Sequence, residues 1–218
     1  ADSGCAEASP SPSPDPSPSP ADVPIQYAIA TGGASNAHLT SSLTVNTAQA
    51  WSFTGWARCN GVCSAMTDNH ILGSYGPSGA RARTYVGLKS SSSCTSGCSG
   101  LTVAAGSSYA HHSSNAQAWS YSLFPANTWF FFAYSVAPGA TAGSIDVSMF
   151  LNNEAPRYWS TTSDGTSAGI SFGTRTGTDG AADTTRCFNG LIDEVAYWST
   201  ALTPAQANAV RTATMRYI

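Results

Sequence analysis

The stretch CFNGLIDEVAYWSTALTPAQANAV, residues 187–210, contains the strand and turn signals that decide the fold. It opens with Asn189 and Gly190, a pair that favours a tight turn at the start of a strand. Ile192 and Val195 are both apolar, but residues three apart cannot share one face of a regular strand. We therefore expect a bulge or a local twist between these two residues.

The rest of the chain from residue 25 onward repeats this strand character. Short runs rich in Val, Ile, Thr and aromatic residues alternate with clusters of Gly, Asn, Asp and Ser, a pattern typical of many short antiparallel strands. The one good helix candidate covers residues 203–215, with Thr203 as N-cap and Pro204 at the first helical position. The sequence therefore predicts an all-β fold, a two-sheet antiparallel sandwich with one short C-terminal helix.

Alternation within the predicted strands also selects a core. The run WFFFAYSV, residues 129–136, is too apolar for a half-exposed strand, so we expect it to cross the centre of a sheet. Six residues are predicted to face the space between the two sheets: Trp129, Phe131, Val147, Met149, Ile192 and Val195.

The stretch at residues 187–210 resembles the closing signature of LamG-like jelly rolls, in the concanavalin A-like lectin/glucanase superfamily. The matching residues are Phe188, Gly190, Ile192, Asp193, Glu194, Val195, Tyr197, Leu202 and Thr203. In order and spacing of strands the resemblance covers about residues 25–215, and it implies a jelly-roll sandwich. The match departs in the helix, where Gln206 and Asn208 stand in place of an acidic residue that would complement the helix dipole.

The resemblance raises the question of a metal at Asp193. In some relatives an acidic residue at this position supports a structural calcium ion, with backbone carbonyls as further ligands. The alternative is a carboxylate that caps backbone N–H groups at a corner of the sheet. No other cofactor is expected.

Glucanases of the superfamily need two carboxylates placed together on one strand. Asp193 and Glu194 are adjacent, so they point to opposite faces, and the sequence contains no nucleophile elbow, phosphate loop or dinucleotide fingerprint. We therefore expect a protein without enzymatic activity.

The composition argues against nucleic-acid-binding and membrane proteins. The 218 residues carry nine Lys and Arg against twelve Asp and Glu, a net charge of −3, which gives no electrostatic case for nucleic acid or an anionic membrane. Charged residues make up only 10% of the chain, so much of the hydrated surface must consist of uncharged polar residues such as Ser, Thr and Asn. No apolar run reaches the length of a membrane span, and no membrane insertion is expected.

Six cysteines point to an oxidising compartment. The simplest of several connectivities pairs Cys59 with Cys63, Cys94 with Cys98, and Cys5 with Cys187. The two C-x3-C units would also suit a tetrahedral zinc site, and reduced thiols are a third alternative. The Ser/Gly/Asn loops around each unit favour small looped disulfides.

Residues 1–24 form a tail of Ser, Pro, Ala and acidic residues that cannot build a core, and residues 25–218 form the domain. Proline at every second position favours an extended polyproline II rod. The tail resembles hydroxyproline-rich glycoproteins of green algae and plants. That resemblance implies hydroxylation and O-glycosylation at Pro10, Pro12, Pro14, Pro16, Pro18 and Pro20 and at Ser11, Ser13, Ser17 and Ser19.

Two functions follow from these features. The first is a secreted, extracellular structural glycoprotein whose tail docks on a neighbouring identical subunit to build a fibre or wall layer. The tail could instead dock on its own domain through a bond between Cys5 and Cys187, or it could be a plain spacer. The second is a glycan-binding module, with Arg157, Tyr158 and Trp159 as an aromatic and cationic cluster that could stack on a sugar. The simpler interpretation of that cluster is the start of a strand, with one ring facing the core.

Overall fold

The fold is given by a computed structural model that describes residues 29–31, 38–61, 69–74, 84–89, 100–105, 123–163, 165–167, 169–174, 181 and 187–215. Its strands are β1 (Ile29–Thr31), β2 (Leu39–Thr40), β3 (Trp51–Cys59), β4 (Asn69–Ser74), β5 (Thr84–Lys89), β6 (Gly100–Ala105), β7 (Trp129–Pro138), β8 (Ser144–Leu151), β9 (Arg157–Thr162), β10 (Ser171–Phe172) and β11 (Gly190–Trp198). Helix α2 (Pro204–Thr214) follows the last strand. The predicted tail at residues 1–24 lies outside the described residues.

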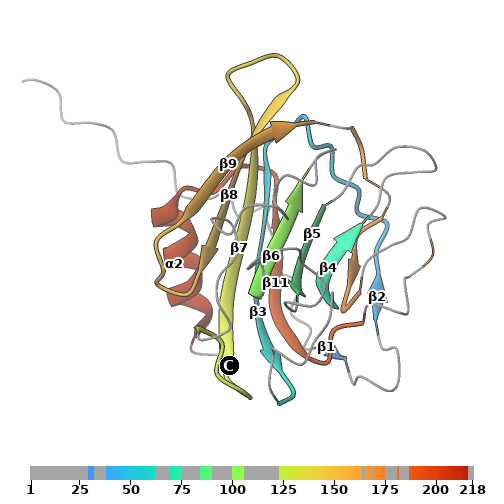
Figure 1. The fold of residues 1–218 in the computed structure, drawn as a ribbon, viewed down its shortest axis with the longest axis vertical. Helices are drawn as coiled ribbons and strands as arrows, with labels where there is room; N and C mark the ends of the chain where they lie inside the picture. Colours follow the sequence, from blue (N-terminus) through green and yellow to red (C-terminus); the bar gives the residue numbers. More distant parts are fainter. Residues whose placement is uncertain are drawn as a thin grey trace, which may run out of the picture.

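The strands form two antiparallel sheets (Figure 1). The six-stranded sheet has the order β1-β11-β3-β7-β8-β9, and the five-stranded sheet has the order β2-β10-β4-β5-β6. The predicted all-β, two-sheet antiparallel jelly-roll sandwich with one C-terminal helix is therefore confirmed. No helix in the described part of the chain is long and apolar enough to cross a membrane.

The core between the sheets comes mostly from alternate residues of the strands, except where a bulge interrupts β4 and β11. Of the six predicted core residues, Val147, Met149, Ile192 and Val195 belong to this buried cluster. From β7 the cluster takes Phe130, Phe132, Tyr134 and Val136, and the five-stranded sheet contributes Ile71, Leu72, Val86, Leu88, Leu101 and Phe172.

The predictions for Trp129 and Phe131 were wrong about the face. Both residues lie on the outer side of the six-stranded sheet. Phe131 belongs to a second buried cluster formed against α2, and the half-buried Trp129 packs against that cluster. Strand β7 is apolar on both faces because one face meets the other sheet and the opposite face meets the helix. Its sequence alone therefore could not show which of the alternating residues point inward.

The predicted irregularity between Ile192 and Val195 is a β-bulge. The pairing of β11 with β3 shifts between Asp193 and Ala196, and Glu194 has a φ of 49°. Gly55 faces this bulge from β3, where an added Cβ would lie 2.9 Å from the Phe132 ring and 3.2 Å from Val195. The extra residue thus brings Ile192 and Val195 to the same face.

Helix α2 is fixed at both ends. Thr203 and Gln206 form a capping box, in which each side chain bonds the backbone N–H of the other residue. Gln206, which departs from the resemblance, therefore has a structural role. At the other end the Trp56 indole donates a hydrogen bond of 2.8 Å to the Thr214 hydroxyl. The helix lies against the outer side of the six-stranded sheet (Figure 1).

Candidate functional site

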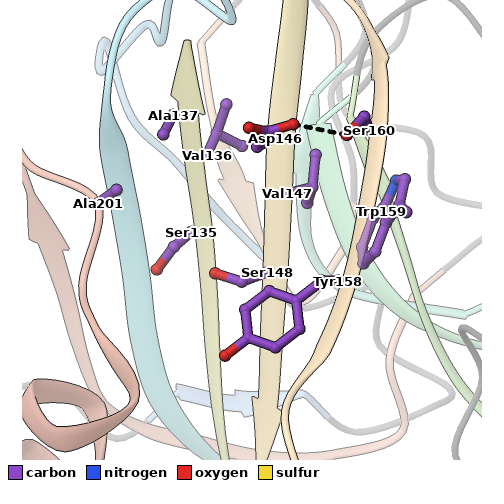
Figure 2. Close-up of a pocket in the computed structure, with 10 residues that line it drawn as sticks. All are labelled: Ser135, Val136, Ala137, Asp146, Val147, Ser148, Tyr158, Trp159, Ser160 and Ala201. Atoms are coloured by element: carbon purple, nitrogen blue, oxygen red, sulfur yellow. Dashed lines mark hydrogen bonds between the residues drawn. The ribbon is translucent and has the colours of Figure 1, made fainter. Parts of the chain in front are cut away.

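The outer side of the six-stranded sheet is only partly covered by α2. Beyond the helix the outward residues become small and polar, and they line a hollow of about 510 Å³ (Figure 2). Its lining residues are Ser135, Val136, Ala137, Asp146, Val147, Ser148, Tyr158, Trp159, Ser160 and Ala201. Strands β7, β8 and β9 build the floor, and the segment between β11 and α2 provides one wall.

Tyr158 is the aromatic group that this hollow offers to solvent. Its side chain is 60% exposed, although it pairs across the sheet with Ser148. Figure 2 shows the phenol ring extending from β9 toward Ser148 on β8. An aromatic ring held on a strand and left uncovered is available to stack on a ligand.

Among the lining residues that the structure describes, Asp146 is the one with a charge. The Ser160 hydroxyl donates a hydrogen bond of 2.5 Å to one oxygen of its carboxylate, from the neighbouring strand β9 (Figure 2). This contact holds the carboxylate in place. The carboxylate can still accept hydrogen bonds from a ligand, because an ionised carboxylate has about four acceptor positions.

A network of buried hydroxyls fixes the wall of the hollow. The hydroxyl oxygens of Ser52 and Ser135 lie 2.7 Å apart. Ser52 also donates to the carbonyl of Thr200 at 2.7 Å and accepts from the N–H of Leu202 at 2.9 Å. These bonds pin both sides of Ala201, which lines the hollow.

The predicted carbohydrate-binding cluster is divided between the two faces of β9. Arg157 pairs with Met149 and Trp159 pairs with Val147, both of which are inward residues of β8. Trp159 is half-buried and packs against the core between the sheets. Tyr158 alone points outward into the hollow, as the alternation of a strand requires. A carbohydrate-binding role for the three residues stays a prediction.

Sequence reasoning missed the polar residues around Tyr158. Ser135, Asp146, Ser148 and Ser160 were not among the predicted binding residues. Their signal was present in the segment SIDVSMF, residues 144–150, where polar residues occupy the alternate positions of an otherwise buried strand. Such polar positions mark a solvated sheet face, but only the pairing of β7, β8 and β9 brings them together.

The Asp193 side chain bonds to the backbone of the bulge that contains it. One oxygen of its carboxylate accepts a hydrogen bond of 2.8 Å from the backbone N–H of Glu194, which is the capping contact considered above. Burial, reinforced by the Asp193 carboxylate, raises the pKa of Glu194 above its ordinary value. The described residues contain no group of three or more His, Cys, Asp or Glu that could hold a metal. Calcium at Asp193, with backbone carbonyls as the other ligands, stays a prediction.

The cysteines are described only in part. Cys59 ends β3 and is disulfide-bonded, but its predicted partner Cys63 lies outside the described residues. Cys94, Cys98 and Cys5 lie outside them as well. Cys187 is a buried thiol, held in a backbone bridge beside His70, so the structure does not support the predicted Cys5–Cys187 bond.

The predicted modification sites on the tail, from Pro10 to Pro20, also fall outside the described residues. Hydroxylation, O-glycosylation and assembly through the tail therefore stay predictions.

Comparison with known proteins gives similarity of structure only. No family model and no curated protein matches the chain. The binding domain of botulinum neurotoxin serotype C1 is similar at 14% identity and a TM-score of 0.47, over 77% of this chain and 37% of that one. Lectin I-B4 from Griffonia simplicifolia is similar at 8% identity and a TM-score of 0.39, over 73% and 78% of the two chains.

A peanut lectin is similar at 8% identity and a TM-score of 0.37, over 81% of this chain and 78% of the lectin. This chain spans less than half the length of the toxin domains of serotypes C1 and D. These similarities assign no function to the chain.

Proposed function

We propose that the protein is a non-enzymatic carbohydrate-binding module whose site is the hollow around Tyr158. One observation carries the proposal: an uncovered aromatic ring lies beside a hydrogen-bonded carboxylate and several hydroxyls on three paired strands. Pyranose rings present an apolar C–H face and a rim of hydroxyls, and these two surfaces match the two kinds of group in the hollow. A few polar groups that fix orientation beside an apolar contact surface are typical of small-molecule sites.

Each group has a defined role in this proposal. The Tyr158 ring stacks on the apolar face of a sugar. The Asp146 carboxylate accepts hydrogen bonds from two neighbouring sugar hydroxyls, while Ser148 both donates and accepts. Because Asp146 is the charged residue among the described lining residues, an acidic sugar would meet repulsion there. The expected ligand is a neutral glycan.

The test is a calorimetric titration of the whole protein with a panel of neutral monosaccharides and oligosaccharides. Tyr158→Ala should weaken binding about tenfold or more, whereas Tyr158→Phe keeps the ring and most of the affinity. Thr162→Ala is the matched control, because Thr162 is an exposed residue of the same strand and does not line the hollow. Unchanged binding by Tyr158→Ala, or no binding of any saccharide, would contradict the proposal.

A second proposed function rests on the tail rather than on the described fold. The alternating Ser and Pro of residues 9–20 favour an extracellular, O-glycosylated structural subunit that is secreted and self-assembles into a fibre or wall layer. Deleting residues 1–22 should leave the sandwich folded and abolish assembly. Sedimentation of the two chains tests this: a truncated chain that still polymerises, or a full-length chain that stays monomeric, would contradict it.

A further inference from the structure

A second hollow lies on the same outer side of the six-stranded sheet. It has a volume of about 390 Å³ and is lined by Phe131, Phe150, Asn152, Asn153, Glu154, Pro156, Pro204, Ala207 and Asn208. Its walls are the first two turns of α2 and the turn that joins β8 to β9. None of these residues was predicted from the sequence to bind a ligand.

The two hollows occupy consecutive positions along β8. Asp146 and Ser148 of β8 lie in the first hollow. Phe150 of β8 lines the second, together with Asn152 in the turn that follows the strand. Outward residues of one strand are two positions apart, about 7 Å along the strand, so the hollows are neighbours. The segment before α2 follows the same course, since Ala201 lines the first hollow and Pro204 the second.

The second hollow, like the first, combines apolar groups with hydrogen-bonding groups. Its floor is apolar, from Phe131, Phe150 and Ala207, and its rim carries amides and one carboxylate. Asn208 accepts from the Arg211 side chain through its amide oxygen, at 3.1 Å, which leaves the amide NH₂ to donate. Glu154 is an exposed acceptor on the opposite wall.

An anionic ligand fits this second hollow poorly. Glu154 places a negative charge on its rim. At the adjacent end of α2 the N–H of Gln206 is already bonded, because the Thr203 hydroxyl accepts from it. A neutral ligand with several hydroxyls meets neither obstacle, since amide donors and a carboxylate acceptor both bind hydroxyls.

We propose that the two hollows are adjacent subsites for one neutral, linear oligosaccharide that runs along the outward row of β8. One sugar lies on Tyr158, and a following sugar lies between the β8–β9 turn and the first turns of α2. This inference rests on the proposed carbohydrate-binding function and deepens it, because it names a chain rather than a single terminal sugar as the ligand.

The test is calorimetric titration of the full chain with neutral gluco-, manno- and galacto-oligosaccharides, from the monosaccharide to the hexasaccharide of each series. For the series that binds, affinity should rise about tenfold or more with length and then level off once both subsites are filled. Asn208→Ala should remove most of this gain and leave monosaccharide binding unchanged. The variant should fold, because alanine favours a helix more than asparagine does.

Thr212→Ala, an exposed position further along α2 that does not line the hollow, is the matched control and should bind every length as the parent does. Tyr158→Ala should weaken binding at every length. If monosaccharides bind through Tyr158 but longer chains bind no tighter, the function stands and the two-subsite inference is overturned. The same inference is overturned if Asn208→Ala binds every length as the parent does. If no saccharide binds, both proposals fail.

Discussion

The outer side of one sheet contains two regions that differ in what covers them. Along β7 and β8 the covered region presents Phe131, Ala133 and Phe150 to α2, whereas the open region presents Ser148 and the buried Ser135 to the first hollow. Both regions use the same two strands in the same register. The change occurs within two residues, between Ala133 and Ser135. On this side of β7 and β8, the large apolar residues therefore lie where the helix covers them.

This difference also identifies Tyr158 as the exception. Every other outward residue of the open region that lines the first hollow is small or charged, but Tyr158 has a large ring that the fold leaves uncovered. A single exposed apolar residue needs no special explanation on a surface. Under the proposed carbohydrate binding, a ring placed in a hollow beside a hydrogen-bonded carboxylate would be a contact surface for the sugar.

The largest expected effect lies in the covered region. Phe131 is 1% exposed and packs edge-to-face against Trp56 with ring centroids 5.4 Å apart. Phe131→Ala should lower the free energy of unfolding by about 3–5 kcal/mol, from lost burial and the cavity left under α2. Urea denaturation of the parent and the variant measures this loss. A loss below about 1 kcal/mol would mean that α2 does not cover this face.

Strand β7 shows which features of the fold could be predicted from the sequence and which could not. The strand could be predicted from its apolar run, as could the antiparallel sandwich and the helix with its Thr203 cap. The inward face could not, because the residues from Trp129 to Phe132 are all aromatic and give no polar position to fix the alternation. In β8 the regular Ser and Asp positions showed which face points inward, and Val147 and Met149 were predicted correctly.

The candidate site was less predictable than the fold. Tyr158 was selected from sequence, but so were Arg157 and Trp159, which the strand turns to the other face. The hollow depends on how much of the sheet α2 covers and on the pairing of β7, β8 and β9. Those are long-range features that a local pattern of residues does not contain.

A smaller loss is expected at the border between the two regions. Ser52 holds the segment before α2 through its bonds to Thr200 and Leu202. Ser52→Ala leaves a buried backbone N–H without a partner, which should cost about 1–3 kcal/mol of unfolding free energy. Because the same bonds fix Ala201, sugar affinity should also fall. Full stability together with full affinity in Ser52→Ala would show that the wall does not depend on this hydroxyl.

A pH-dependent effect is expected beside the covered region, at the bulge. The pKa of Glu194 is raised in the folded protein, chiefly by burial, so folding favours the protonated carboxyl. This stabilisation is fully present below the ordinary glutamate pKa and is lost as the pH rises through the folded-state pKa. Glu194→Gln cannot ionise. The parent should therefore lose stability relative to this variant as the pH rises from acidic to neutral.

Denaturation of both chains at a series of pH values measures the difference. Parallel stability profiles would contradict the raised pKa, because the difference between the two chains would then not depend on protonation.

The smallest expected effect on stability is at Tyr158, where the effect on binding is expected to be the largest. Its ring is 60% exposed, so Tyr158→Ala should change the free energy of unfolding by no more than about 0.5 kcal/mol. The adjacent Trp159 is its matched comparison, because Trp159 packs against the core between the sheets and its replacement by alanine should cost clearly more. Denaturation of the two variants measures this contrast. If Tyr158→Ala were as costly as Trp159→Ala, the ring would be part of the folded core and the open region would lose its distinction from the covered one. If Tyr158→Ala is nearly neutral in stability but abolishes sugar binding, the ring serves the ligand, because its removal then affects nothing else that can be measured.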